Sequence, residues 1–370
     1  MHTSLKQNFD IFKQKLDADI KEIPQVFQAK YLSGLDGLRA ISITFVVLAH
    51  SLLGKAWDNY FPGSIGVDIF FVISGFLITT LLLKEKIRNG KVSLKKFYVR
   101  RILRIFPVAY LYLFCLLILT YIFHLDTTLR MFLIAGLYLR NFPIQQGGNW
   151  QTAHFWSLAV EEQFYLLFPF ILVRSIKKYL FLVLPILITL PFIIIVGQLS
   201  FHAFNYQIIG KFILSFTYLL GWGTSSILIG SVTSILIFKR IINVDDRQPY
   251  FLSLIVFVVA ICFHITGVLN WNALIYIFPT LISYVIVLNL KGANFFSLIL
   301  NHPILIKVGK LSYSIYIWQQ LFTLSQPWKG YFKYSDSLLL NGIALLAVSY
   351  TSYTFFESKF LNLKGKFRTI

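Results

Sequence analysis

Stretches of about 18 or more mostly apolar residues recur from residue 35 toward the end of the chain, and each is long enough to cross a bilayer as an α-helix. Of the 370 residues, 57% are hydrophobic and 13% are charged, whereas about 25% are charged in a typical soluble domain. No polar segment after residue 34 is long enough to fold alone. The sequence therefore predicts an all-α, polytopic membrane bundle with a single membrane domain.

About ten transmembrane helices are predicted from these runs. They cover residues 35–53, 65–83, 105–123, 153–173, 179–197, 212–238, 250–267, 272–290, 310–326 and 337–356. A shorter apolar run, MFLIAGLYL, is too short to cross and is expected to be re-entrant or interfacial. The predicted domains are a cytoplasmic N-terminal tail (1–34), the membrane domain (35–357) and a basic cytoplasmic tail (358–370).

The distribution of Lys and Arg gives this bundle a direction. A net charge of +19 would suggest nucleic acid in a soluble protein. Here topology explains it better, because 27 of the 34 Lys and Arg fall on the cytoplasmic side if the N-terminus is inside. Both termini are therefore predicted to be cytoplasmic, with no nucleic-acid partner, and the first helix is expected to remain as an anchor because no cleavable signal precedes it.

Few signatures of other chemistry occur in the chain. The two cysteines, Cys115 and Cys262, lie in apolar runs without metal-ligand spacing, so no metal is predicted. The sequence has no Walker or GxGxxG loop, which argues against an ATP-driven pump or a nucleotide-binding domain.

The first predicted span carries two polar residues, Arg39 and His50. They are eleven residues apart, so they share one helical face about 16 Å apart along the axis. With the N-terminus inside, Arg39 lies near the cytoplasmic end and His50 toward the outside. Arg39 alone could snorkel to the interface and His50 alone could bond a carbonyl. The presence of both residues on one helical face favours a polar cavity, because charged or titratable side chains are costly in lipid.

The segment HFWSLAVEEQFYLLFPF places Ser157, Glu161 and Tyr165 at intervals of four residues, and therefore on one helical face. A carboxylate inside the membrane needs a partner, and His50 is predicted at a similar depth. A His50–Glu161 pair could act as a general base. A structural ion pair between the first and fourth spans explains the pattern equally well.

The basic stretch RRILRIFP presents Arg101 and Arg104 on one side of a helix. Paired guanidinium groups suit phosphates, because each offers a planar fork of donors. Ordinary positive-inside charge or attraction to anionic lipid is the competing interpretation.

Taken in order, these blocks resemble the acyltransferase-3 family of integral membrane acyltransferases. The resemblance extends from residue 33 to about 360 and rests on six blocks: LDGLRAISITFVVLAH, GVDIFFVISGFLIT, RRILRIFP, HFWSLAVEEQFYLLFP, GKLSYSIYIWQQ and FFESKF. It implies a ten-helix core in a plasma (bacterial inner or cytoplasmic) membrane. It also implies O-acyl transfer, commonly of acetyl, from cytoplasmic acetyl-CoA to an extracytoplasmic carbohydrate.

The resemblance also implies roles for the residues singled out above. Arg101 and Arg104 become candidates for binding the CoA phosphates, and Arg39 for guiding the donor. His50, with Glu161, would activate an acceptor hydroxyl, which is a poor nucleophile without a base. The remaining catalytic candidates are the two other residues on the face of Glu161, Ser157 and Tyr165.

Two departures from the family pattern concern the end of the chain. Gln319 follows Trp318 where many relatives have histidine. An amide cannot act as a base at neutral pH, so no catalytic role is predicted for Gln319. Some relatives carry a fused extracytoplasmic hydrolase-like domain, whereas this sequence ends in LNLKGKFRTI. The chain is therefore expected to complete the transfer itself or to pass the acyl group to a separate protein.

Two other functions fit the same residues. A transporter or channel for a lipid-linked sugar or an ion could use Arg39, His50 and Glu161 along its pathway. Transporter folds often contain internal repeats, and none is evident in this sequence. A non-catalytic assembly scaffold is the third interpretation, and it predicts that His50 and Glu161 tolerate substitution.

Overall fold

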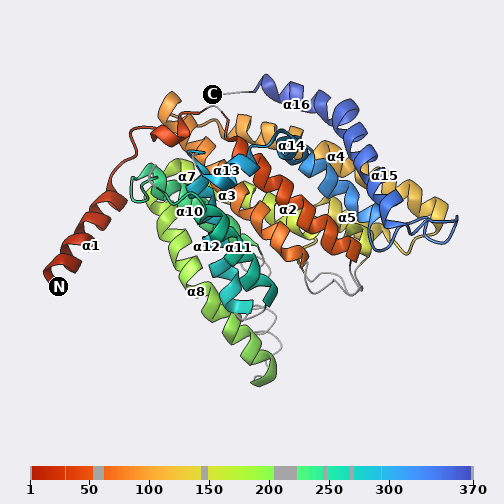
Figure 1. Ribbon diagram of the computed structural model, residues 1–370, viewed down its shortest axis with the longest axis horizontal. Helices are drawn as coiled ribbons and strands as arrows, with labels where there is room; N and C mark the ends of the chain where they lie inside the picture. Colours follow the sequence, from red (N-terminus) through yellow and green to blue (C-terminus); the bar gives the residue numbers. More distant parts are fainter. Residues whose placement is uncertain are drawn as a thin grey trace.

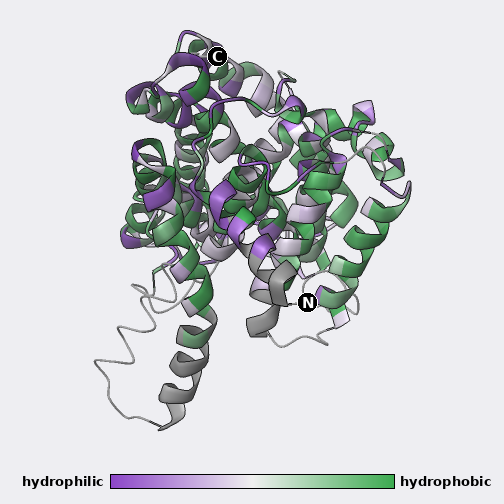
Figure 2. Cartoon of the chain, turned by 90° about the vertical axis from the view of Figure 1, so that its left-hand side faces the viewer, coloured by the Kyte–Doolittle hydropathy of each residue, from purple (hydrophilic) through white to green (hydrophobic). Residues whose placement is uncertain are grey.

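The computed structural model describes residues 2–29, 31–52, 62–142, 149–203, 223–244, 248–266, 271–292 and 294–367. In these ranges all regular structure is helical and no strand occurs, so the predicted all-α class is confirmed. The helices pack into a bundle from which α1 (His2–Asp17) projects at one side (Figure 1). Hydrophobic residues cover long stretches of the outer helices (Figure 2).

Five helical stretches are long and apolar enough to cross a membrane, which supports a multi-pass membrane protein. They are α2 (Ser33–Leu52), α3 (Gly63–Asn89), α4 (Leu94–Phe123), α6 (Trp150–Ala153) continued by α7 (Phe155–Arg174), and the run Leu338–Gly365. The predicted count of ten is not reached within the described ranges.

The other five predicted spans coincide with further helices. These are α8 (Ile176–Ala203), α10 (Thr224–Phe238), α11 (Leu252–Thr266), α12 (Trp271–Asn289) and α14 (Pro303–Phe322). Of these, α10 and α11 have only 15 residues each, fewer than the roughly 20 that a helix needs to cross a bilayer. Residues 212–222 of the sixth predicted span lie outside the described residues.

The helix α4 begins eleven residues earlier than predicted, at Leu94 rather than at 105. The side chain of Ser93 accepts a hydrogen bond from the backbone N–H of Lys96, 3.3 Å away, and so caps the first turn. The basic stretch is therefore helical. As a result, Arg101 and Arg104 stand two to three turns inside α4 and can face its neighbours.

Two segments predicted as tails contain helices. A 3₁₀ turn, η1 (Gln25–Phe27), places Phe27 in the core, fully buried against the rings of Phe76 and Phe238. At the other end, α15 (Leu338–Thr351) continues through the π-helix η3 (Ser352–Glu357) into α16 (Ser358–Gly365), which packs along α4. The short apolar run after α4 forms α5 (Leu129–Gly136), an eight-residue helix.

The centre of the bundle is formed by α2, α3, α10 and α14. Here α14, preceded by the short helix α13 (Phe295–Leu300), runs parallel to α2. Gly309 lies against the backbone of Asp36 near the start of both helices, and Gln319 meets His50 near their ends. A Cβ atom added at Gly309 would lie 1.9 Å from the Asp36 carbonyl oxygen, so only glycine allows this close approach.

Candidate active site

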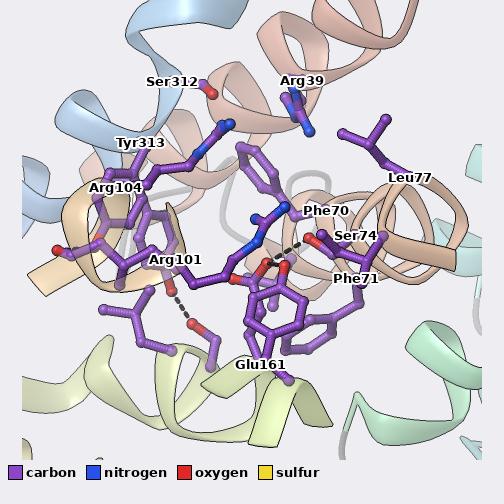
Figure 3. Close-up of a pocket in the computed structure, with 17 residues that line it drawn as sticks. Arg39, Phe70, Phe71, Ser74, Leu77, Arg101, Arg104, Glu161, Ser312 and Tyr313 are labelled. Carbon is purple, nitrogen blue, oxygen red and sulfur yellow. Dashed lines mark hydrogen bonds between the residues drawn. The ribbon is translucent and has the colours of Figure 1, made fainter. Parts of the chain in front are cut away.

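One pocket brings together six of the seven residues singled out from the sequence. Its volume is about 710 Å³, including its open mouth. Three helices supply the six residues, which are Arg39 from α2, Arg101 and Arg104 from α4, and Ser157, Glu161 and Tyr165 from α7. The helices α3 and α14 complete the wall with residues that include Ser74, Tyr313 and Tyr316 (Figure 3).

Glu161 is held by hydroxyl groups from two helices. Both Ser74 on α3 and Tyr165, one turn further along α7, donate hydrogen bonds to the Glu161 carboxylate. The predicted spacing of Glu161 and Tyr165 on one face is therefore correct. The guanidinium of Arg101 lies 4.9 Å from the centre of the Tyr165 ring, a cation–π distance that ties α4 to the same cluster.

The three pocket arginines differ in their partners. Arg39 Nη1 donates to Asp36 Oδ1 at 2.8 Å, and the hydroxyl of Tyr31 also donates to Asp36. Partial burial, together with the neighbouring Asp36 carboxylate, raises the pKa of Tyr31, so this phenol stays protonated as a donor.

Arg101 and Arg104, by contrast, form no ion pair or hydrogen bond with any residue that the structure describes. In Figure 3 the side chains of Arg39, Arg101 and Arg104 extend into the same space. The pocket thus carries two guanidinium forks that form no ion pair with a described carboxylate, and this arrangement suits a multiply charged anion.

Ser157 connects α7 to α14 through hydrogen bonds. Its hydroxyl donates to the carbonyl oxygen of His154 at 3.0 Å and also contacts the Tyr316 hydroxyl. Tyr316 itself donates to the same carbonyl at 3.2 Å. Ser157 therefore joins α7 to α14 at the edge of the pocket.

His50 does not line the pocket. Its Nδ1 lies 2.9 Å from Oε1 of Gln319, and its ring meets the Trp150 ring edge-on at 5.2 Å. Neither a hydrogen bond nor an ion pair connects the described side chains of His50 and Glu161, so the predicted pair does not form. Each residue has polar partners of its own on different helices.

His50 lies about one helical turn beyond the pocket. Val67 and Tyr316 line the pocket, whereas His50 is close to Gly63, four residues before Val67, and contacts Gln319, three residues after Tyr316. Three to four residues of α-helix correspond to about 5 Å. His50 thus lies further along the bundle than the pocket that holds the arginines and Glu161.

The contribution of α14 to the pocket and to the surroundings of His50 was not predicted from the sequence. Ser312, Tyr316 and Gln319 recur at intervals of four and three residues, and this polar stripe is visible in an otherwise apolar segment. An amide such as that of Gln319 is not a base, but it can orient one. Among the described residues, no group of His, Cys, Asp or Glu is arranged to hold a metal ion.

Comparison with known proteins identifies a matching protein family and several relatives. A family model described as "acyltransferase domain" matches residues 32–356 of this chain. The chain is 30% identical to the O-acetyltransferase OatA of Staphylococcus aureus (strain NCTC 8325 / PS 47), covering 81% of this chain and 52% of that protein. It is 29% identical to a provisionally named O-acetyltransferase of Staphylococcus aureus (strain COL), covering 78% of this chain and 50% of that protein. The chain spans about half the length of these relatives, and no solved structure matches it.

Proposed function

Because the chain belongs to the acyltransferase-3 family, we propose that it is a membrane O-acetyltransferase that moves an acetyl group from cytoplasmic acetyl-CoA to a hydroxyl of an extracytoplasmic glycan or lipid-linked glycan. The names of its relatives support the O-acetyl chemistry. We further propose a bacterial plasma membrane, with both termini cytoplasmic, on the basis of the Lys and Arg distribution.

The observation that carries this proposal is the pair Arg101 and Arg104, which form no ion pair with a described residue and line the same pocket as Glu161. CoA carries several phosphate charges at one end and a thioester at the other. The two arginines bind the phosphates, and Arg39, held by Asp36, guides the donor. The apolar wall of Phe70, Phe71 and Leu77 suits the long arm that leads to the thioester.

His50 acts as the general base at the end of this path. Its Nε2 takes the proton from the acceptor hydroxyl while the hydroxyl oxygen attacks the thioester carbonyl carbon. A C–O bond forms, the C–S bond breaks, and the CoA thiolate receives the proton from the imidazolium. Glu161, Ser157 and Tyr165 shape the pocket that holds the donor: the carboxylate offsets part of the arginine charge, and the two hydroxyls fix α7 to its neighbours.

Mass spectrometry of cell-surface glycans, with and without the gene, tests this function. The enzyme predicts glycans that are heavier by one acetyl in place of a hydrogen only when the gene is present. Purified protein in liposomes should also transfer label from radioactive acetyl-CoA to the glycan fraction. A transporter instead predicts unmodified glycan that fails to reach the surface, and that result would contradict the proposal.

Arg101→Ala and Arg104→Ala are each expected to raise the KM for acetyl-CoA by about 10-fold or more, because a hydrogen bond to a charged group contributes about 1.5–3 kcal/mol. The kcat should change less, since neither side chain reaches the thioester in the proposed binding mode. Initial rates measured over a range of acetyl-CoA concentrations give both constants.

Lys96→Ala is the matched control for the arginine variants, because Lys96 is a cationic residue that is exposed on the same helix. Its KM should equal that of the wild type. Equal KM values in all four proteins would mean that Arg101 and Arg104 do not bind the donor.

A further inference from the structure

We propose that Gln319 is a positioning residue that holds the ring of His50 in one tautomer, with the proton on Nδ1 and the free electron pair on Nε2. The inference rests on the proposed function of His50 as the base. It assigns Gln319 a task in catalysis without making it a base itself.

The carbonyl oxygen of Trp150 determines how the side-chain amides of Gln319 and Gln320 are oriented. Gln320 Nε2 donates to the carbonyl oxygen of Trp150 at 2.8 Å, and a carbonyl oxygen can only accept. The other side of the Gln320 amide, Oε1, therefore faces Gln319 and accepts from its Nε2 at 2.6 Å. Only Oε1 of Gln319 is then left to face His50.

The same logic fixes the proton on the histidine. The Oε1 atom of Gln319 can only accept, and it lies 2.9 Å from Nδ1 of His50. The Nδ1 atom must therefore carry the hydrogen that makes this bond. In a neutral imidazole the other nitrogen, Nε2, is then unprotonated and able to accept a proton.

We call His50, Gln319, Gln320 and the Trp150 carbonyl the relay. Its two glutamines are buried, and further hydrogen bonds hold its members in place. Gln319 is 0% and Gln320 is 1% exposed. The indole N–H of Trp150 donates back to the Gln320 carbonyl at 3.0 Å, and the backbone N–H of Leu324 donates to the His50 carbonyl at 3.4 Å. A flipped amide would leave buried groups without partners, which costs about 1–3 kcal/mol for each group.

The base atom lies against the start of α3. Nε2 of His50 would lie 3.7 Å from a Cβ atom built at Gly63. Among the described residues Nε2 has no hydrogen-bond partner. The pocket that holds Arg101 and Arg104 ends about one turn away from this atom.

A neutral glutamine also suits the location of His50. A carboxylate partner would orient the ring equally well, but it would place a second ionisable group inside a membrane helix, where a charge is costly. Gln319 accepts from Nδ1 without adding charge and does not compete for the proton that Nε2 receives.

Gln319→Met tests the proposal, because methionine has a similar length and offers no comparable acceptor. Losing the bond that selects the tautomer should lower kcat by about 5- to 100-fold, which corresponds to the loss of about 1–3 kcal/mol. The KM for acetyl-CoA should stay within about two-fold of wild type, because Gln319 lies outside the donor pocket.

Gln326→Met is the matched control. Gln326 is also buried, and its Nε2 donates only to the carbonyl of Phe322, at 3.4 Å, so it is not part of the relay. Its kcat should equal that of wild type. A loss as large as that of Gln319→Met would mean that the effect is one of packing, and the proposal would be wrong.

The tautomer can be measured independently of activity. Nitrogen NMR of protein labelled at its seven histidines, with His50 assigned by its absence in His50→Gln, should show hydrogen on Nδ1 in wild type and a mixture in Gln319→Met. Identical tautomer populations would overturn the proposal. If His50→Ala is inactive while Gln319→Met has wild-type kcat, the positioning role alone is refuted. Full activity of His50→Ala refutes the base itself.

Discussion

Replacing His50 with alanine is expected to lower the kcat of acetyl transfer by about 10²- to 10⁴-fold, the usual contribution of a positioned general base. The acceptor hydroxyl then has no group to take its proton as it attacks. The KM for acetyl-CoA should change little, because His50 lies about a turn beyond the pocket proposed to hold the donor. Steady-state rates with purified protein in liposomes measure both constants.

The control for this variant is His264→Ala. His264 is another buried histidine, at the end of α11, where its Nε2 lies 3.3 Å from the hydroxyl of Ser64. It has no part in the relay, so its variant should keep kcat within a few-fold of wild type. The amount of folded protein, measured by size-exclusion chromatography in detergent, must be similar in both variants. Wild-type kcat in folded His50→Ala protein would remove His50 from the mechanism.

Gly309→Val is expected to yield little folded protein. A Cβ atom at this position would lie 1.9 Å from the carbonyl oxygen of Asp36, and the obstacle is backbone, which cannot rotate away. The helices α2 and α14 would have to separate, and overpacking of this kind costs about 1–3 kcal/mol, occasionally more. Any protein that does fold should have a lowered kcat, since the same helix pair joins His50 to Gln319. Thermal unfolding in detergent gives the loss of stability.

Gly342→Val provides the comparison for Gly309→Val. Gly342 lies in α15, and a Cβ atom there would meet nothing within 4 Å. This variant should unfold at nearly the temperature of the wild type. If Gly309→Val were equally stable, the close contact between α2 and α14 would not be needed for the fold.

The parts of the site that the sequence predicted correctly are those set by one helix. The intervals between Ser157, Glu161 and Tyr165, and between Arg101 and Arg104, determine a shared face whatever the rest of the chain does, and all five residues line the pocket. The prediction of helices also succeeded, because backbone hydrogen bonds inside a membrane leave few alternatives.

The predictions that failed concern pairs of helices. The depth of His50 and Glu161 was inferred from topology, but their contact depends on how each helix is rotated about its axis. That rotation is determined by contacts between distant residues, such as Gly309 with Asp36, which no local pattern shows. The burial of Phe27 also depends on contacts with distant residues. Phe27 is an aromatic residue in a mostly polar segment, and its side chain packs between α3 and α10.

The gap of about one turn between the pocket and His50 has a consequence for the size of the group transferred. If the phosphates of the donor are held at Arg101 and Arg104, the length of the CoA arm sets where the thioester carbon stops. An acetyl group extends only one methyl group beyond that carbon. A longer acyl chain would have to continue past His50 toward Trp150 and Gln320, where the side chains are closely packed. Under the proposed function, the distance between the two arginines and His50 would therefore favour short acyl groups.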